Sequence, residues 1–363
     1  MAKFTLVAGA RPNFMKIAPI IHALQKAKRN NPNLSYRLVH TGQHYDKKMS
    51  GDFFEQLNIP KPDANLGGGG GTQAEQTASI MVAFEKELIE NPCDLVLVVG
   101  DVTSTLACSI AAKKLKIDVA HVEGGIRSGD LGMPEEINRM VTDSITDHFF
   151  TTSEIANNNL RKLGFREDQI HYVGNTMIDT LKAQMPRFRQ PEGEIFDGLE
   201  KKGYFIMTMH RPANVDQEQQ LKAMLDAILE GTRGLPIIFP VHPRTAKILG
   251  TLGIDAPNLH LCEPLGYLEF NYLVRNAKAV ITDSGGITEE ASVMNVPCIT
   301  LRDNTERAET IHLGTNELVG TDPEKLRPYL DQVMEGNWKE YQGIPLWDGK
   351  TAERIVDILL SAY

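Results

Sequence analysis

Apolar runs of strand length alternate with segments of helical period along almost the whole chain. DLVLVVG, for example, precedes STLACSIAAKKL, and DHFFTTS precedes EIANNNLRKLG. A strand that is apolar throughout must be buried on both faces, and a helix after it returns the chain to a parallel neighbouring strand. The alternation therefore predicts an α/β fold with doubly wound parallel sheets in Rossmann-like domains.

Two series of this alternation are separated by a stretch of different character. The segment TLKAQMPRFRQPEGEIFDGLEKKG has little apolar period and carries two prolines, which is typical of a linker. We therefore predict an N-terminal Rossmann-like domain over residues 1–175, a linker over 176–202 and a C-terminal Rossmann-like domain over 203–345. Residues 346–363 are predicted to form an amphipathic helix that could pack back on the N-terminal domain. The active site is expected in the cleft between the domains.

Composition and charge exclude several classes of function. The formal net charge of -9 argues against nucleic acid or an anionic membrane as the main partner. No run approaches the roughly 18 apolar residues of a membrane span. Four scattered cysteines without a CxxC pair indicate reduced thiols, and hence a soluble protein of the cytoplasm: Cys93, Cys108, Cys262 and Cys298.

Cations follow the first predicted strand. Ligands of open α/β sheets bind just beyond the carboxyl ends of strands, and FTLVAG is followed by ARPN and then Lys16. This is not the GxGxxG fingerprint of a dinucleotide, so no NAD is expected. Arg11 and Lys16 could instead bind an anion at a helix N-terminus, although solvated surface charge is an alternative.

Carboxylates follow two further strands. Asp101 follows DLVLVVG, Glu123 follows DVAHV, and Glu135 and Glu136 lie in MPEEINR. Positioned carboxylates can act as general acids and bases, but each of these could instead cap a helix or complement its dipole. Their expected convergence on one cleft favours an acid/base set.

Two histidines end strands of the second series, and a glycine run lies in the first. His210 ends GYFIMTMH and His242 ends LPIIFPVH, so both are expected to face the cleft. A metal site is an alternative, but no HExxH or similar ligand spacing is present, and no metal is predicted. The run GGGGG over 67–71 lacks a following Gly-Lys-Ser/Thr and predicts a mobile loop rather than a phosphate loop.

The stretch TDSGGITEEA places two acids in a predicted phosphate-binding turn. If the backbone of residues 284–286 binds a diphosphate, Glu290 lies roughly 6 Å deeper along the helix, at about 1.5 Å per residue. A carboxylate there can accept both hydroxyl hydrogens of a ribose. Arg307 and Arg11 are then the candidate cations for the diphosphate.

Taken together in this order, the motifs ARPNFMKIAP, GDVTST, HVEGGIRSGD, MPEEINR, MHRPAN, EPLGYLEF, DSGGITEEA and LRDNTERAE resemble the non-hydrolysing UDP-N-acetylglucosamine 2-epimerases. The resemblance spans nearly the whole chain. It implies a two-domain, GT-B glycosyltransferase-like fold, no cofactor, the interconversion of UDP-GlcNAc and UDP-ManNAc, and a cytoplasmic homodimer that serves polysaccharide biosynthesis.

The resemblance also implies roles for individual residues. The family's catalytic groups match Asp101, Glu123, Glu135 and His210. In EPLGYLEF, Leu265 and Phe270 match its uracil contacts. The full set of implied substrate contacts is Arg11, Lys16, His242, Leu265, Phe270, Ser284, Gly285, Gly286, Glu290 and Arg307. Some members carry an allosteric site, but Asp46 and the glycine run replace its residues here.

The chemistry favours elimination. The C2 hydrogen of the sugar is not adjacent to a carbonyl, and without NAD the ring cannot be oxidised. We therefore expect anti elimination of UDP to a 2-acetamidoglucal and re-addition with protonation on the other face, which needs two proton-transfer groups. Alternatives are the same reaction on a UDP-2,3-diacetamido-2,3-dideoxy-glucuronate, hydrolysis to free ManNAc, glycosyl transfer, and a nucleotide-sugar sensor.

Overall fold

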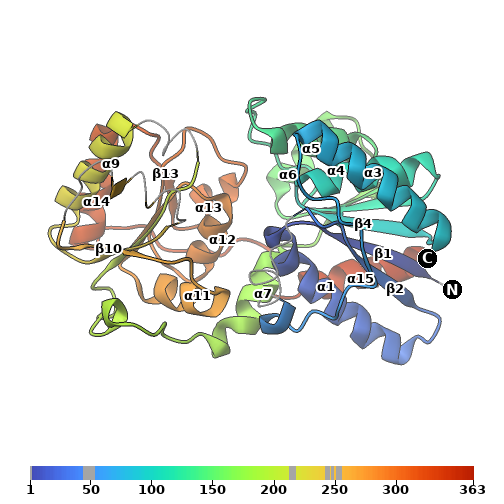
Figure 1. Ribbon diagram of the computed structural model, residues 1–363, viewed down its shortest axis with the longest axis horizontal. Helices are drawn as coiled ribbons and strands as arrows, with labels where there is room; N and C mark the ends of the chain where they lie inside the picture. The colour runs from blue at the N-terminus through green and yellow to red at the C-terminus, as the bar shows by residue number, and fades with distance from the viewer. Residues whose placement is uncertain (1, 44–53, 212–217, 242–245, 247–248, 251–255) are drawn as a thin grey trace. The chain divides into compact units, whose positions relative to one another are not determined.

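The computed structural model describes the chain except for residues 1, 44–53, 212–217, 242–245, 247–248 and 251–255 (Figure 1). The chain divides into two compact units. The first unit comprises Met1–Ala183 and Pro345–Tyr363, and the second comprises Gln184–Ile344. Both contain a parallel sheet flanked by helices, which confirms the predicted α/β class.

The first unit contains a seven-stranded sheet in the order β3-β2-β1-β4-β5-β6-β7, and every described pairing is parallel. Its strands are β1 Lys3–Ala8, β2 Ser35–His40, β3 Ala64–Asn65, β4 Leu95–Val99, β5 Asp118–Val122, β6 His148–Thr151 and β7 Ile170–Tyr172. Its helices are α1 Arg11–Asn30, α3 Gln73–Glu90, α4 Thr103–Lys114, α5 Pro134–Ser144, α6 Glu154–Lys162, η1 Glu167–Gln169, α7 Thr176–Gln184 (whose last residue begins the second unit) and α15 Thr351–Ala362.

The second unit contains a six-stranded sheet in the order β10-β9-β8-β11-β12-β13, again parallel throughout. Its strands are β8 Phe205–Thr208, β9 Ile237–Pro240, β10 Leu259–Cys262, β11 Ala279–Thr282, β12 Cys298–Thr300 and β13 Asn316–Leu318. Its helices are η2 Met185–Arg187, η3 Glu194–Phe196, α9 Glu218–Gly231, α11 Tyr267–Asn276, α12 Gly285–Val293, α13 Ala308–His312 and α14 Pro323–Glu335.

Both sheets are buried on their two faces, as continuous apolar strands require. All five residues of β4, LVLVV, are buried. In the second unit, Phe205 and Met207 pack into one core with α9 and α14, whereas Ile206 packs into the other with α11. Successive strand residues therefore serve opposite faces. None of the described helices is long and apolar enough to span a bilayer.

Strand order reverses once in each sheet. From β1 the first sheet continues to β2 and β3 on one side and to β4 and β5 on the other, and in the second sheet the same reversal separates β8 from β11. Chains that leave such neighbouring strands depart to opposite faces and open a crevice at the carboxyl ends. The segments that follow β1 and β4, and those that follow β8 and β11, are therefore the places to look for a site.

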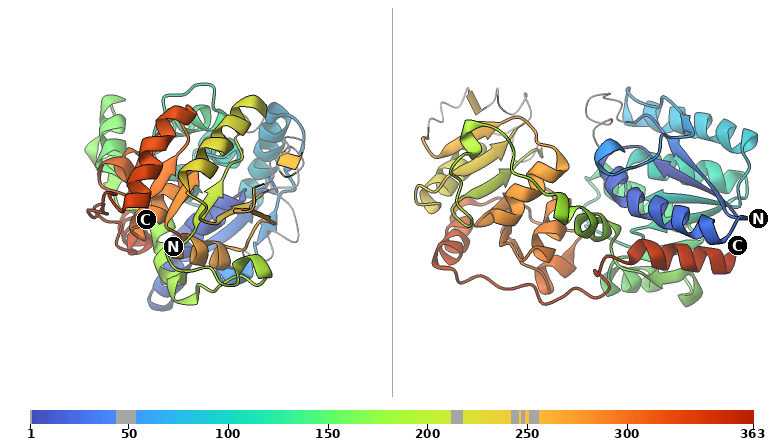
Figure 2. Two further views of the ribbon diagram at one scale, coloured as in Figure 1. Left: turned by 90° about the vertical axis from the view of Figure 1, so that its left-hand side faces the viewer. Right: turned by 90° about the horizontal axis from the view of Figure 1, so that it is seen from below.

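The C-terminal helix belongs to the first unit. Helix α15 packs beside α1 (Figure 2), and the preceding Trp347 is buried and donates from Nε1 to the Thr152 carbonyl at 2.9 Å. Asp179 of α7 accepts from the amides of Thr351 and Ala352, at 3.1 and 2.7 Å. Because Lys350 makes no side-chain cap, Asp179 satisfies the first amides of α15 from another helix. The segment predicted as a linker thus begins with a helix, α7, that anchors the chain's end.

We expect Asp179→Ala to lower the free energy of unfolding by about 1–2 kcal/mol, because two buried amides at the start of α15 lose their acceptor. Urea unfolding measures this change. The control is Glu353→Gln on the same helix, which removes an ion pair with Lys26 whose side chains are 74% and 52% exposed. Exposed pairs contribute little, so the control should match the parent. Equal effects of the two substitutions would contradict the capping role.

Candidate functional site

Lys16 and Glu123 form a buried ion pair at the carboxyl end of the first sheet. Lys16 Nζ lies 2.7 Å from Glu123 Oε2, and the two side chains are 9% and 0% exposed. Helix α1 is held in place by Asn13, whose Oδ1 accepts from the amides of Gly9 and Ala10 at 3.1 Å each. The predicted cation after β1 and the predicted acid after β5 are therefore in direct contact.

The backbone around this pair adopts an unusual conformation. Glu123 has φ 74°, in the left-handed region that non-glycine residues rarely adopt. Gly100 has φ 67°, and a Cβ there would lie 3.0 Å from Lys16 Nζ. Strain of this kind persists only where surrounding structure imposes it, and it concentrates at functional sites. Gly100 therefore leaves room for the ion pair and turns the chain into Asp101.

Asp101 is held by an arginine that the sequence analysis did not single out. Arg139 of α5 donates from Nε and Nη2 to Asp101 Oδ2, at 3.0 and 2.6 Å, and its own side chain is 2% exposed. Asn138 Nδ2 donates to the Asp101 carbonyl at 2.8 Å. The carboxylate keeps partial exposure, at 21% of its side chain. Asp101 is thus fixed in orientation while one side remains open to solvent.

The adjacent acids Glu135 and Glu136 lie in different surroundings. Glu136 is buried, and its carboxylate accepts from the amides of Ser128 and Gly129 at 3.1 and 3.0 Å and from Arg139 Nη1 at 2.6 Å. Burial opposes its ionisation, but these donors prevail and hold the pKa of Glu136 below its usual range. Glu135 is exposed. Glu136 therefore has a structural partner set, and Glu135 is the one available to a ligand.

One predicted contact and one residue that departs from the allosteric motif lie outside what the structure describes. His242 falls in 242–245, and Asp46, at the neighbourhood of the allosteric motif, falls in 44–53. Arg11 begins helix α1, but its side chain is not described.

The glycine run is described: Gly68 donates to the Thr41 carbonyl at 2.7 Å, and a Cβ there would lie 2.5 Å from Ile80 Cγ1. Gly68 thus permits close packing against α3.

In the second unit, His210 and Asp283 end the two strands that flank the reversal. His210 Nδ1 lies 3.0 Å from Asp283 Oδ1, and the buried carboxylate also accepts from the amides of His210 and Arg211. The His210 side chain is 64% exposed. Asp283 therefore orients the ring of His210 while leaving Nε2 on the exposed side.

Helix α12 begins at the predicted diphosphate turn. Ser284 caps the helix without a side-chain bond, and its amide donates to Thr282 Oγ1 at 2.9 Å. The first amides inside a helix have no acceptor within it, so those of Gly285 and Gly286 are the ones directed outward. A Cβ on Gly286 would meet open space, whereas one on Gly285 would lie 2.5 Å from Glu306 Oε1.

The two acids of this helix are neutralised in different ways. Glu289 pairs with Arg307, whose Nε lies 2.6 Å from Oε1, and both side chains are buried. Glu290 accepts from the Tyr267 hydroxyl at 2.6 Å. Burial raises the pKa of Glu290 from 4.5 to about 7, against the hydrogen bonds of Tyr267 and Asn271. Neither acid therefore opposes an anion at the helix start with a full unpaired charge near neutral pH.

The two residues expected at the uracil lie at the start of helix α11 and within it. Leu265 precedes helix α11, and Phe270 lies within it. Both are half-buried and pack on the core cluster that includes Leu273 and Val274. Tyr267, on the same helix as Phe270, links α11 to α12 through its hydrogen bond to Glu290.

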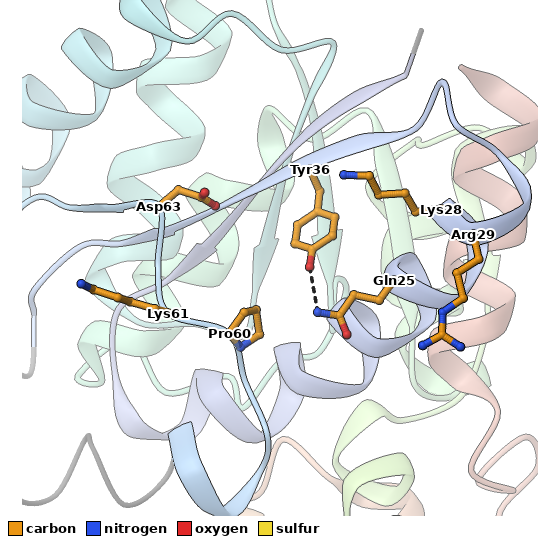
Figure 3. Close-up of a pocket in the computed structure, with 7 residues that line it drawn as sticks. All are labelled: Gln25, Lys28, Arg29, Tyr36, Pro60, Lys61 and Asp63. Carbon is orange, nitrogen blue, oxygen red and sulfur yellow. Dashed lines mark hydrogen bonds between the residues drawn. The ribbon is translucent and has the colours of Figure 1, made fainter.

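A basic hollow of about 410 Å³ also occurs on the first unit (Figure 3). Lys28 and Arg29 line it from the last turn of α1, and Tyr36 accepts from Gln25 Nε2 at 3.1 Å. Because Tyr36 starts β2, the hollow lies at the amino edge of the sheet, opposite the strand ends described above. Cations at a helix C-terminus complement its dipole, which accounts for this cluster.

Comparison with known proteins points to one enzyme family. A family model described as UDP-N-acetylglucosamine 2-epimerase matches residues 26–360. The UDP-N-acetylglucosamine 2-epimerase of Methanocaldococcus jannaschii is 43% identical over 369 residues, with 98% of each chain covered. The UDP-2,3-diacetamido-2,3-dideoxy-D-glucuronate 2-epimerase of Pseudomonas aeruginosa is 36% identical and covers 98% of this chain and 99% of that protein.

Solved structures agree with these sequence matches. The UDP-GlcNAc 2-epimerase of M. jannaschii in complex with UDP-GlcNAc and UDP superposes with a TM-score of 0.87 at 42% identity, over 99% of each chain. The enzyme of Neisseria meningitidis bound to UDP-GlcNAc gives a TM-score of 0.88 at 30% identity, over 99% of this chain and 100% of that one. The predicted GT-B-like fold with two α/β domains is thereby confirmed.

The buried acid Glu290 predicts a pH-dependent stability. Its folded pKa of about 7 lies above its ordinary 4.5, so its contribution to stability is full below about pH 4.5 and is lost as pH rises through 7. Glu290→Gln keeps the acceptor for Tyr267 and carries no charge. We expect the melting temperature of the variant, relative to the parent, to be higher at about pH 8 than at about pH 5.5. Thermal melts at both pH values measure it.

The control for this experiment is Glu263→Gln, on the exposed surface of the same unit. Its offset from the parent should be the same at both pH values. A Glu290→Gln offset that also stays constant with pH would show that the Glu290 carboxyl is not neutralised by burial.

Proposed function

The chain belongs to the UDP-N-acetylglucosamine 2-epimerase family, and on this premise we propose that it is an isomerase that reversibly converts UDP-GlcNAc to UDP-ManNAc. The observation that carries the proposal is the set of acids at the strand ends of the first unit. Glu123 is paired with Lys16 and Asp101 with Arg139. Such pairs fix the orientation of the carboxylates, as proton abstraction from carbon requires.

The proposed reaction is an anti elimination followed by re-addition. A carboxylate removes the C2 proton while the bond from C1 to the UDP oxygen breaks, giving 2-acetamidoglucal and UDP. UDP then adds back to C1 while a second acid protonates C2 from the opposite face. Asp101, Glu123 and Glu135 are the proposed proton-transfer groups, and His210 would stabilise the departing diphosphate. No oxidant or metal is needed for this sequence.

The second unit would bind the nucleotide. We propose that Gly285 and Gly286, with Ser284 as the helix cap, receive the diphosphate at the start of α12, where outward amides favour an anion. Glu290 would accept from the ribose hydroxyls, and Leu265 and Phe270 would contact the uracil. The remaining substrate contacts in this proposal are Arg11, Lys16, His242 and Arg307.

Exchange of the C2 hydrogen with solvent tests the reaction. In deuterated water with UDP-GlcNAc alone, proton NMR should show a mixture with UDP-ManNAc and loss of the C2 proton signal. Asp101→Asn, Glu123→Gln and Glu135→Gln should each lower kcat by about 10²–10⁴-fold. Glu136→Gln is the matched control for Glu135→Gln. Replacing the buried, hydrogen-bonded Glu136 should lower the melting temperature, whereas replacing the exposed Glu135 should not.

Other outcomes would identify the alternatives. Turnover only of a UDP-2,3-diacetamido-2,3-dideoxy-glucuronate would assign the substrate class of the P. aeruginosa relative. Free ManNAc with UDP would indicate a hydrolysing epimerase, and UDP release only with an added sugar acceptor would indicate a transferase. Binding of UDP-GlcNAc without exchange at C2 would indicate a sensor and contradict the proposal.

We also propose a homodimer that uses the outer face of α3 and α5. These helices flank α4 (Figure 1), and residues of α3 and α5 line a hollow of about 630 Å³. Val82, Ile137 and Met140 are 55%, 49% and 46% exposed, and Leu131 is 66% exposed. Contiguous exposed apolar side chains on one helix layer are typical of a surface that a partner covers. A second copy of the chain would pair this face with itself.

Val82→Glu should convert the dimer to a monomer, because it places a charge in the centre of the proposed interface. Light scattering after size exclusion measures the mass. Leu163→Glu is the control, since this residue is equally exposed, at 60%, but lies at the end of α6. A parent protein that is monomeric, or a Val82→Glu variant that stays dimeric, would contradict this interface.

We further propose that the enzyme acts in the cytoplasm and supplies polysaccharide biosynthesis. All four cysteines, each in a described segment, are free thiols, and burial raises the pKa of the Cys298 thiol to about 12. Unreactive buried thiols are compatible with a reducing compartment. The product is an activated sugar, which a glycosyltransferase could use as its donor.

A further inference from the structure

His121 lies in the interior of the first unit, between two loops that carry proposed catalytic acids. It is the fourth residue of β5 and is fully buried. Its Nε2 lies 2.8 Å from the Gly100 carbonyl oxygen, and its Nδ1 lies 2.7 Å from Asp143 Oδ1. Both ring nitrogens therefore have a partner within hydrogen-bonding distance.

The nature of the two partners determines the hydrogens on the ring. A carbonyl oxygen can only accept, so Nε2 must donate to Gly100. Asp143 Oδ2 accepts from the Gly125 amide at 3.0 Å and pairs with Arg127 Nη1 at 2.6 Å. Burial opposes ionisation of Asp143, but His121 and Arg127 outweigh it and hold the pKa of this carboxyl below its usual range. An ionised carboxylate also only accepts, so Nδ1 must donate as well.

A ring that donates from both nitrogens is an imidazolium ion. It forms a buried cluster with Asp143 and Arg127, in which two cations surround one carboxylate. Burying charges is unfavourable unless they are paired and hydrogen-bonded, and an apolar residue at this position would avoid that penalty. Packing alone therefore does not account for these buried charges.

The cluster connects the segments that carry the proposed catalytic acids. Gly100 immediately precedes Asp101, and its left-handed φ of 67° sets the direction in which the chain continues. The Gly125 amide, bound to Asp143, lies two residues after Glu123. Asp143 itself is on α5, the helix that begins with Glu135 in its first turn. One ring and one carboxylate thus join the three segments that carry the acids.

We propose that His121 is a positioning residue for the epimerisation: as an imidazolium bound to Gly100 and Asp143, it holds the loops of Asp101 and Glu123 and helix α5 in register. This inference rests on the proposed function for its catalytic consequence. The charge state of the ring is independent of that function.

Two amide variants separate the two bonds. In His121→Asn the side-chain nitrogen replaces Nδ1 and can still donate to Asp143, but the bond to Gly100 is lost. In His121→Gln the nitrogen replaces Nε2 and keeps the bond to Gly100, but the bond from residue 121 to Asp143 is lost. We expect His121→Asn to lower kcat by about tenfold or more, with KM for UDP-GlcNAc and the dissociation constant of UDP within about twofold. His121→Gln should restore part of kcat.

The control is His148→Asn, on neighbouring β6, where the ring contacts the Tyr363 hydroxyl at the amino end of the strand. It should leave kcat unchanged. A His121→Asn variant with unchanged kcat would overturn the proposal. So would a loss of UDP binding in parallel with kcat, because that pattern indicates general unfolding rather than loss of positioning.

Nitrogen NMR of protein labelled in histidine provides a readout besides activity. Because both partners of the ring are acceptors, both ring nitrogens of His121 should carry a hydrogen, and the signals should vanish in His121→Gln. A single ring N–H would overturn the inference even if the enzyme is active. Two ring N–H groups in a protein that shows no exchange at C2 would instead contradict the proposed function and leave the charge state in place.

Discussion

Parallel pairing of strands buried on both faces is the constraint on which the site depends. It forces every strand of a sheet to end at the same edge, so residues far apart in the chain become neighbours there. Lys16 and Glu123 meet in this way across 107 positions. The strand order reverses between β1 and β4, and the proposed catalytic acids Asp101 and Glu123 follow β4 and β5 at this edge.

Four acids near that edge each lie beside a cation. Glu123 has Lys16, Asp101 and Glu136 share Arg139, and Asp143 has His121 and Arg127. Several carboxylates in one small region would otherwise raise one another's pKa values. Pairing fixes their orientation and holds the pKa values of Glu136 and Asp143 below their usual range, and Glu135 stays exposed. The arrangement suits a reaction in which distinct groups exchange protons with one carbon.

The sequence predicted the strand ends well and the partners poorly. Apolar runs locate Asp101, Glu123 and His210 because a strand must stop where burial stops. The sequence analysis did not single out Arg139, because its pairing with Asp101 depends on how α5 packs beside the segment that follows β4. Its i,i+3 spacing from Glu136 was a usable signal. Glu135 and Glu136 could not be separated, because adjacent helical residues point in directions that only the packing of α5 decides.

The acids in the predicted phosphate turn illustrate why local charge counting fails. TDSGGITEEA places two carboxylates within the helix whose first amides attract anions, and in isolation they would oppose binding. Arg307 neutralises Glu289, and burial against Tyr267 brings the pKa of Glu290 to about 7. A ribose hydroxyl that donates to Glu290 would favour its ionised form, since hydrogen bonds to a carboxylate lower its pKa. Binding of the sugar and ionisation of the acid would therefore be linked, each promoting the other.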